Sequence, residues 1–319
     1  MGSRPANRLH SVGMDLPDVE TLRSLVASYA ALCAAHGGAF ADPPLVQPTG
    51  EFFPDEFRPD PPSVVRLLRR MMGYAPIADD LGVEIVFFEA EQQGGGGGCG
   101  SIACGEGGGA ATRAVPVQEV DDGYRVFVCA SDVGHSDLLT TSLARSVGGL
   151  VLHEAGADVD AVTSEIAAAA CGFGVLLANG AAVWGKSCGG LRMASATVCS
   201  IEEATTLLAL FVAVHGRKAA AARAHLGATQ REAFDLAQAW VESNPLLVES
   251  LRDRPEVLEG GSFAIEPVRG LVGRWLHKRK LDKELSAPAT APPPSTRTPE
   301  QQRRFLEAKA LVDEVMGEE

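Results

Sequence analysis

Apolar residues recur at helical spacing in two segments near the beginning of the chain. In residues 19–36 they fall every three or four positions, with acidic residues before them and Gly37 after them, which predicts an amphipathic helix. Residues 63–74 show the same spacing and follow two prolines that suit a helix start, so a second helix is predicted there. The Pro-rich segment 41–62 between them excludes a long helix, and we expect its phenylalanines to anchor it to the core.

The part of the chain after the second predicted helix contains residues that favour strands. Residues 83–90 are mostly β-branched and aromatic, which predicts a strand. Two further strands are predicted at 114–120 and 124–129, because the Asp-Asp-Gly sequence at 121–123 is typical of a tight hairpin turn. The segment 92–113 contains runs of glycine and almost nothing that can be buried, so we expect a mobile loop there.

The pattern changes to helical periodicity after position 132, and a break is expected in the second of these helices at Gly172 or Gly174. The order of elements predicts an α+β fold, in which a small antiparallel sheet packs on a mainly helical body. The predicted helices of this body cover residues 136–151, 158–184, 201–215, 218–226, 229–243 and 245–253.

Composition divides the chain into four parts. Residues 1–18 are expected to be disordered, and residues 19–284 to form a single α+β domain that includes the Gly/Cys-rich loop at 92–113. A linker rich in Pro, Ser and Thr is predicted at 285–299, followed by a C-terminal amphipathic helix at 300–319. This helix either docks on its own domain or binds a partner protein, and the sequence leaves both alternatives open.

Charge and cysteine content indicate which kinds of partner and which cellular compartment to expect. The 28 Lys+Arg residues against 41 Asp+Glu give a net charge of −13, which excludes the basic surface that nucleic-acid binding needs. Seven cysteines are too few for a disulfide scaffold, and the first residues contain no apolar run typical of a signal peptide. We therefore expect a cytoplasmic protein.

One apolar segment, 166–184, has roughly the length of a membrane span. It consists mostly of Ala and Gly and contains the polar Asn179, and such sequences insert weakly. We interpret it as a buried helix, so no membrane span is expected.

The sequence His153-Glu154 suggests the His-Glu-x-x-His zinc helix, in which two imidazoles one turn apart hold the metal. The residue four positions after His153 is Ala157, so the second ligand is missing. His153 is therefore interpreted as a surface or interface histidine. No other pair of histidines is separated by three or four residues, since they stand at positions 10, 36, 135, 153, 215, 225 and 277.

Three stretches in order resemble a family of largely uncharacterised bacterial proteins with a zinc-metallopeptidase-like (zincin-like) core. They are residues 50–74, which include a Phe-Pro-Asp sequence, the segment Leu-Ala-Arg-Ser-Val-Gly-Gly at 143–149, and residues 160–182. In that family the middle segment is similar to Leu-Ala-His-Glu-Leu-Gly-His, and an acidic helix follows it. The resemblance implies a zincin-like pair of helices at the centre of the helical body.

The same alignment implies that the metal site is degenerate. Arg145 and Gly149 stand where the family has its two zinc-binding histidines, and Ser146 stands where it has the catalytic glutamate. Ala161 aligns with the acidic metal ligand, although Glu165 one turn later is acidic. An Arg cannot ligate zinc, a Gly has no side chain, and a Ser is not a carboxylate base at neutral pH.

A guanidinium at a former metal position gives nearby carboxylates a positive partner. Our hypothesis is that Arg145 pairs with Glu165 or Asp160, so that an ion pair replaces a metal-centred link between two helices. The alternative is that Arg145 faces solvent, where an isolated ion pair contributes little to stability.

The cysteines offer another candidate site. Cys99 and Cys104 lie among glycines that permit both sulfurs to face one another, as two thiolate ligands or a reversible disulfide. The alternative is an inert loop, because no second Cys or His pair follows in it. Cys188 beside Lys186 is a candidate thiol nucleophile, although a packed cysteine in a tight glycine turn fits the same pattern. Cys33, Cys129 and Cys171 are predicted to be core residues.

The sequence and the resemblance together predict a non-catalytic metallopeptidase-like protein with a binding or assembly role. Its partner is expected to be a protein, and no cofactor is expected. The alternative is a metal-binding or thiol-dependent protein that uses the Cys99/Cys104 loop, with zinc as the metal.

Overall fold

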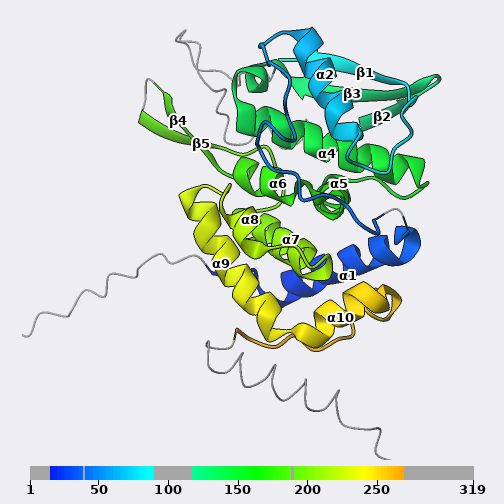
Figure 1. Ribbon diagram of the computed structural model, residues 1–319, viewed down its shortest axis with the longest axis vertical. Coiled ribbons are helices and arrows are strands. Elements are labelled where there is room, and N and C mark those ends of the chain that lie inside the picture. The colour runs from blue at the N-terminus through cyan, green and yellow to red at the C-terminus, as the bar shows by residue number, and fades with distance from the viewer. Residues whose placement is uncertain (1–14, 39, 90–116, 188–189, 269–319) are drawn as a thin grey trace, which may run out of the picture. The chain divides into compact units, whose positions relative to one another are not determined.

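The fold was analysed in a computed structural model that describes residues 15–38, 40–89, 117–187 and 190–268. These residues all belong to one compact unit, Met1–Arg269. The predicted α+β fold is confirmed, since helices form more than half of the described residues, and the strands among them form one sheet of three and one of two (Figure 1).

The three-stranded sheet consists of β1 (Val83–Phe88), β2 (Val117–Val120) and β3 (Gly123–Cys129), in the order β1-β3-β2. The predicted hairpin is confirmed, because β2 and β3 are antiparallel and join at the Asp-Asp-Gly turn. The prediction of an antiparallel sheet is wrong for β1, which pairs with β3 in parallel. Parallel pairing needs a long connection, and residues 89–122 between β1 and β3 supply it, because they include β2, which runs antiparallel to β3.

Helix α4 (Ser136–Glu154) lies between this sheet and the helical segment that follows it in the chain, α5 (Ala161–Ala168) and α6 (Gly174–Gly180) (Figure 1). Alternate residues of β3, namely Tyr124, Val126 and Val128, are buried, as expected for a strand with one face on the core. Helix α2 (Pro61–Met72) also packs on α4. The result is a helix buried almost all round, which explains why α4 has so few polar residues in its second half.

The long apolar segment predicted at 158–184 is broken as expected. It forms α5 (Ala161–Ala168), a π-helical turn (Ala169–Phe173) and α6 (Gly174–Gly180). Gly172 has φ of +91°, a conformation that glycine adopts without strain, and its carbonyl accepts a hydrogen bond from the Val46 amide. Within Ala161–Gly180, 83% of the most apolar 18-residue stretch is buried inside the domain, as in a core helix of a soluble protein.

The end of that segment differs from the prediction. Instead of continuing as a helix to Trp184, the chain forms a β-hairpin from β4 (Val183–Ser187) and β5 (Gly190–Ala194). Trp184 and Met193 are cross-strand partners and are 59% and 54% exposed. Of the turn predicted at 186–190, Lys186 and Ser187 instead belong to β4 and Gly190 to β5, while 188–189 lie outside the described residues.

The other helices agree with the predicted ranges to within a few residues. They enclose a core that includes Tyr29, Phe211 and Trp240, all at most 1% exposed. These helices are α1 (Val19–His36), α7 (Ile201–Val214), α8 (Ala219–Arg223), α9 (Ala228–Ser243) and α10 (Pro245–Asp253), with 3-10 turns at Ala130–Gly134 and Pro255–Val257.

The Pro-rich segment between α1 and α2 packs on the core. Two of the three phenylalanines that were predicted to anchor it do so. Phe52 contacts the Tyr74 ring edge to face, at 5.5 Å between ring centroids, and Phe53 also packs against the core. Phe57 is 42% exposed, so it does not anchor the segment. Val46 is fully buried in the same segment.

Glycine allows α4 to approach α5 and α6 closely. A Cβ atom on Gly148 of α4 would lie 2.0 Å from the Ser164 carbonyl oxygen of α5. A Cβ atom on Gly180 of α6 would lie 2.0 Å from Thr141 Oγ1 of α4. Only hydrogen fits in these positions, so the two contacts bring the backbones of α4, α5 and α6 together around the residues described next.

Candidate functional site

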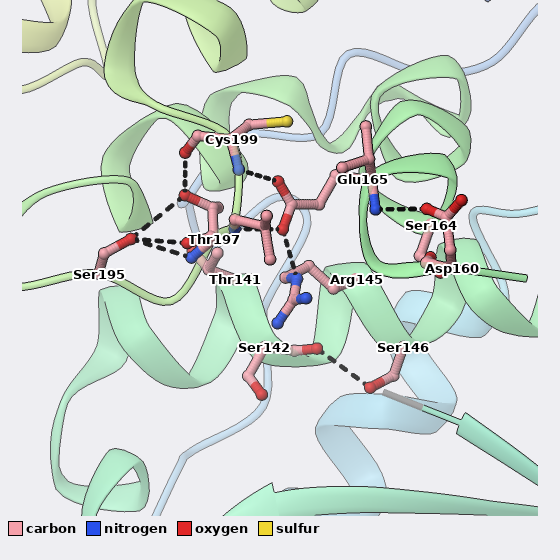
Figure 2. A network of polar contacts seen from close by, with 12 residues as sticks. Thr141, Ser142, Arg145, Ser146, Asp160, Ser164, Glu165, Ser195, Thr197 and Cys199 are labelled. Carbon is pink, nitrogen blue, oxygen red and sulfur yellow. Dashed lines mark hydrogen bonds and ion pairs between the residues drawn. The ribbon is translucent and has the colours of Figure 1, made fainter. Parts of the chain in front are cut away.

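Arg145 of α4 and Glu165 of α5 form an ion pair in the interior of the domain (Figure 2). The distance from Arg145 Nε to Glu165 Oε1 is 2.6 Å, and the two side chains are 3% and 1% exposed. The hypothesis that Arg145 pairs with Glu165 is confirmed, and the alternative that it faces solvent is wrong. A charge pair at this depth has lost nearly all of its water, so each partner depends on the other.

Glu165 also holds a segment that lies far away in the sequence. Its Oε1 accepts a hydrogen bond from the Val198 amide at 2.7 Å, and its Oε2 accepts one from the Cys199 amide at 2.9 Å. These amides directly precede Ser200, which caps the N-terminus of α7. The carboxylate therefore links α4, α5 and the segment that leads from the β4–β5 hairpin into α7.

Asp160 has a different role. Its Oδ1 accepts hydrogen bonds from the Val162 and Thr163 amides at 2.7 and 2.8 Å, while Thr163 Oγ1 accepts one from the Asp160 amide. This reciprocal arrangement is a capping box that starts α5. The structure thus selects Glu165 over Asp160 as the partner of Arg145.

The other positions implied by the resemblance lie on the same two helices. Ser146 is fully buried, and its hydroxyl donates to the Ser142 carbonyl at 3.1 Å. Gly149 is buried one turn further along α4, and Ala161 is the half-buried first residue of α5. Among the described residues, no three His, Cys, Asp or Glu side chains gather in a group that could hold a metal ion.

The cysteines predicted to carry chemistry lie outside the described residues, namely Cys99, Cys104 and Cys188. Cys171 and Cys199 are buried, and Cys33 and Cys129 are half-buried. Burial raises the pKa of the Cys33 thiol to about 11, and burial followed by the Glu165 carboxylate raises the pKa of Cys199. Burial of Cys33 and Cys199 thus disfavours the thiolate form that a nucleophilic or metal-binding role needs.

His153, the remaining residue of the failed zinc motif, is half-buried near the end of α4. Its ring lies 5.3 Å from the Tyr124 ring, between centroids, and the Tyr124 hydroxyl donates to Glu154 Oε1 at 2.8 Å. Burial and this carboxylate raise the pKa of Tyr124 to about 12. The Tyr124–Glu154 hydrogen bond links β3 to the end of α4. His153 and Glu154 therefore contribute to packing between this strand and this helix.

Sequence reasoning missed one unusual histidine, His215, directly after α7. It lines a hollow of about 970 Å³ together with Cys33, Phe40 and Leu251, and its ring packs on Phe211 at 4.7 Å between centroids. Burial, and then the nearby Arg217 and Arg252 guanidiniums, lower the pKa of His215 to about 4 despite the opposing effect of Asp42. No sequence signal marks this position, because the two arginines come from different elements.

The lowered pKa of His215 predicts a loss of stability in mild acid. Because the folded-state pKa of about 4 lies below the ordinary value of 6.5, the unfolded chain binds this proton first as the pH falls. The free energy of unfolding should therefore decrease between pH 6.5 and pH 4. Urea unfolding across this range should show a shallower decrease for His215→Gln than for the wild type. Equal slopes for the two proteins would contradict the prediction, and measurements at pH 7 to 8 provide the reference.

Comparison of the chain with protein families, with curated proteins and with solved structures finds no match.

Proposed function

We propose that this chain is a non-catalytic, metallopeptidase-like protein with a binding or assembly role. In this proposal α4 and α5 correspond to the zincin-like helix pair, and the Arg145–Glu165 ion pair stands where metallopeptidases hold zinc. The residues that would perform catalysis are replaced by Arg145, Ser146 and Gly149. A permanently positive guanidinium repels a metal cation and cannot coordinate it.

The buried Arg145–Glu165 ion pair is the observation that carries the proposal. A charged pair at 3% and 1% exposure is costly to desolvate, and an apolar pair of similar size often gives equal or greater stability. In the proposal Glu165, one turn after the Ala161 position of the family's acidic ligand, takes the place of that ligand. A lost metal site then explains the cost, because this acidic side chain is already buried and a guanidinium at position 145 neutralises it in one substitution. The carboxylate then keeps its structural contacts to the Val198 and Cys199 amides.

A binding role is supported by the exposed cross-strand pair Trp184 and Met193 on the β4–β5 hairpin. Large apolar side chains that adjoin on a surface are typical of regions that contact other molecules. The base of the hairpin is tied to the domain by the Ala196 amide, which donates to the Gly180 carbonyl at 2.8 Å.

Elemental analysis of the purified, reduced chain tests this proposal. We expect no stoichiometric metal after dialysis against zinc and then buffer, in the wild type and in the Cys99→Ser, Cys104→Ser double variant alike. About one equivalent of zinc in the wild type that is lost in the double variant would instead favour the alternative, a metal site in the Gly/Cys-rich loop.

A gain-of-function variant tests the proposed origin of the site. The triple replacement Arg145→His, Ser146→Glu and Gly149→His should bind about one zinc ion with Glu165 as the further ligand, and adding Glu165→Ala should abolish this binding. If the triple variant keeps the wild-type circular dichroism spectrum and binds no more zinc than the wild type, the proposed relationship to zincins is wrong.

A further inference from the structure

Three nitrogen groups surround the Glu165 carboxylate and come from two separate parts of the chain: the Arg145 guanidinium forms an ion pair with it, and two backbone amides donate hydrogen bonds to it. They are Arg145 Nε at 2.6 Å, the Val198 amide at 2.7 Å and the Cys199 amide at 2.9 Å (Figure 2). A guanidinium combined with consecutive backbone amides is a strong arrangement for binding a carboxylate. We infer that Arg145, Val198 and Cys199 form a preorganised carboxylate-binding cradle, which the chain fills with its own Glu165 and which accepts a free small carboxylate when that side chain is removed.

The amide side of the cradle is held by contacts that do not involve Glu165. Thr197 Oγ1 donates to the Cys199 carbonyl at 2.7 Å, and Ser195 Oγ donates to the Thr197 carbonyl at 2.9 Å. The next residue, Ser200, accepts a hydrogen bond from the Glu203 amide at the start of α7. These bonds fix the course of the segment, so the Val198 and Cys199 amides stay directed at the same point without the carboxylate.

The guanidinium side is fixed by its position on α4. Arg145 is 2% exposed as a whole residue, and α4 is held against α5 by the Gly148 contact with Ser164. The guanidinium therefore cannot turn to solvent without moving a helix that is packed on several sides. Removal of Glu165 takes away the carboxylate of this buried ion pair, which favours a carboxylate that fits the vacated space.

The size of that space identifies the ligand class. Replacing Glu165 by Ala removes one methylene carbon, one carboxylate carbon and two oxygens, which is the heavy-atom content of acetate. Acetate is therefore the matched probe. Acetamide has the same shape without the charge, and propionate has one carbon more than the vacated space.

The test is thermal unfolding of the full-length Glu165→Ala variant at increasing acetate concentration, with chloride replaced to keep the ionic strength constant. Acetate should raise the Tm of the variant with saturation, by about 5 °C at a concentration far above its Kd. The wild type should not respond, because its cradle is occupied. Acetamide should have no effect on either protein, and propionate should be weaker than acetate.

A second variant assigns the effect to the cradle. In the Arg145→Met, Glu165→Ala double variant the acetate response should disappear, because the buried positive charge is gone. If Glu165→Ala does not fold alone, refolding in acetate should recover soluble protein where acetamide does not. Equal responses of the wild type and Glu165→Ala to acetate, a response that survives Arg145→Met, or no difference between acetate and acetamide would each overturn the inference. These outcomes do not depend on the proposed relationship to metallopeptidases, which the zinc experiments test separately.

Discussion

Replacing Glu165 by Ala is expected to lower the free energy of unfolding by about 3 to 5 kcal/mol. The substitution leaves the buried Arg145 guanidinium without its carboxylate and removes the acceptor of the Val198 and Cys199 amides. Urea unfolding at neutral pH, in a buffer free of carboxylates, measures the effect. Glu165→Gln should cost less, because its amide oxygen still accepts one of these hydrogen bonds.

An exposed ion pair in the same chain provides the matched control. Arg223 and Asp235 form a bidentate pair at 2.7 and 2.9 Å, with side chains about half exposed. Asp235→Ala should cost no more than about 1 kcal/mol, because both charges keep most of their water. A Glu165→Ala cost as small as that of Asp235→Ala would show that the buried pair contributes little. In the Arg145→Met, Glu165→Ala double variant, the loss of unfolding free energy should be smaller than the sum of the losses in the two single variants.

Replacing Gly172 by Ala is expected to cost at least about 3 kcal/mol. The substitution forces a side chain into the φ of +91° and places its Cβ 1.8 Å from the Pro44 carbonyl oxygen. Relief of this contact requires the chain at residues 43–46 to move away from the π-helical turn, which breaks the hydrogen bond from the Val46 amide to the Gly172 carbonyl. Urea unfolding again measures the loss.

Gly156 separates the backbone strain from the steric contact. It has φ of +66° after the end of α4, and among the described residues no heavy atom lies within 4 Å of its Cβ position. Gly156→Ala should therefore cost only about 1 kcal/mol, which is the strain of the left-handed conformation alone. Equal costs at Gly156 and Gly172 would show that the Pro44 contact relaxes without penalty.

The helices could be predicted from sequence because their signals are local. The apolar spacing of α1 and α7 is uninterrupted, and residues such as Asp18 and Ser200 stand at the cap positions where their side chains accept backbone hydrogen bonds. The break at Gly172 was predictable for the same reason, since a glycine in an apolar helical run marks a change of backbone conformation.

The sheets were harder to predict because strand pairing is not local. The parallel pairing of β1 with β3 joins Val83 to Tyr124, and nothing in either strand specifies the direction of its partner. The β4–β5 hairpin was missed because its strands are short and contain Gly185 and Gly190, which are unfavourable in strands. The tertiary contacts of its base with Gly180 and Glu165 compensate for this weak preference.

The candidate site was predicted in part. Placing Arg145 and an acidic residue on neighbouring helices was enough to suggest an ion pair, and Glu165 proved to be the partner. The Val198 and Cys199 amides were not predictable, because they lie more than thirty residues away and backbone donors leave no trace in side-chain identity. His215 was missed for a related reason, since its environment is created by residues distant in sequence.

The segment between α1 and α2 has the composition of a linker, yet Phe40 is 3% exposed and Val46 is fully buried. The Val46 amide is hydrogen-bonded to the turn between α5 and α6, at the centre of the domain. Helix α1 is therefore joined to the rest by buried backbone and cannot detach as an independent module. Opening of this segment requires opening of the core, so the region from α1 to α7 should unfold in a single cooperative step.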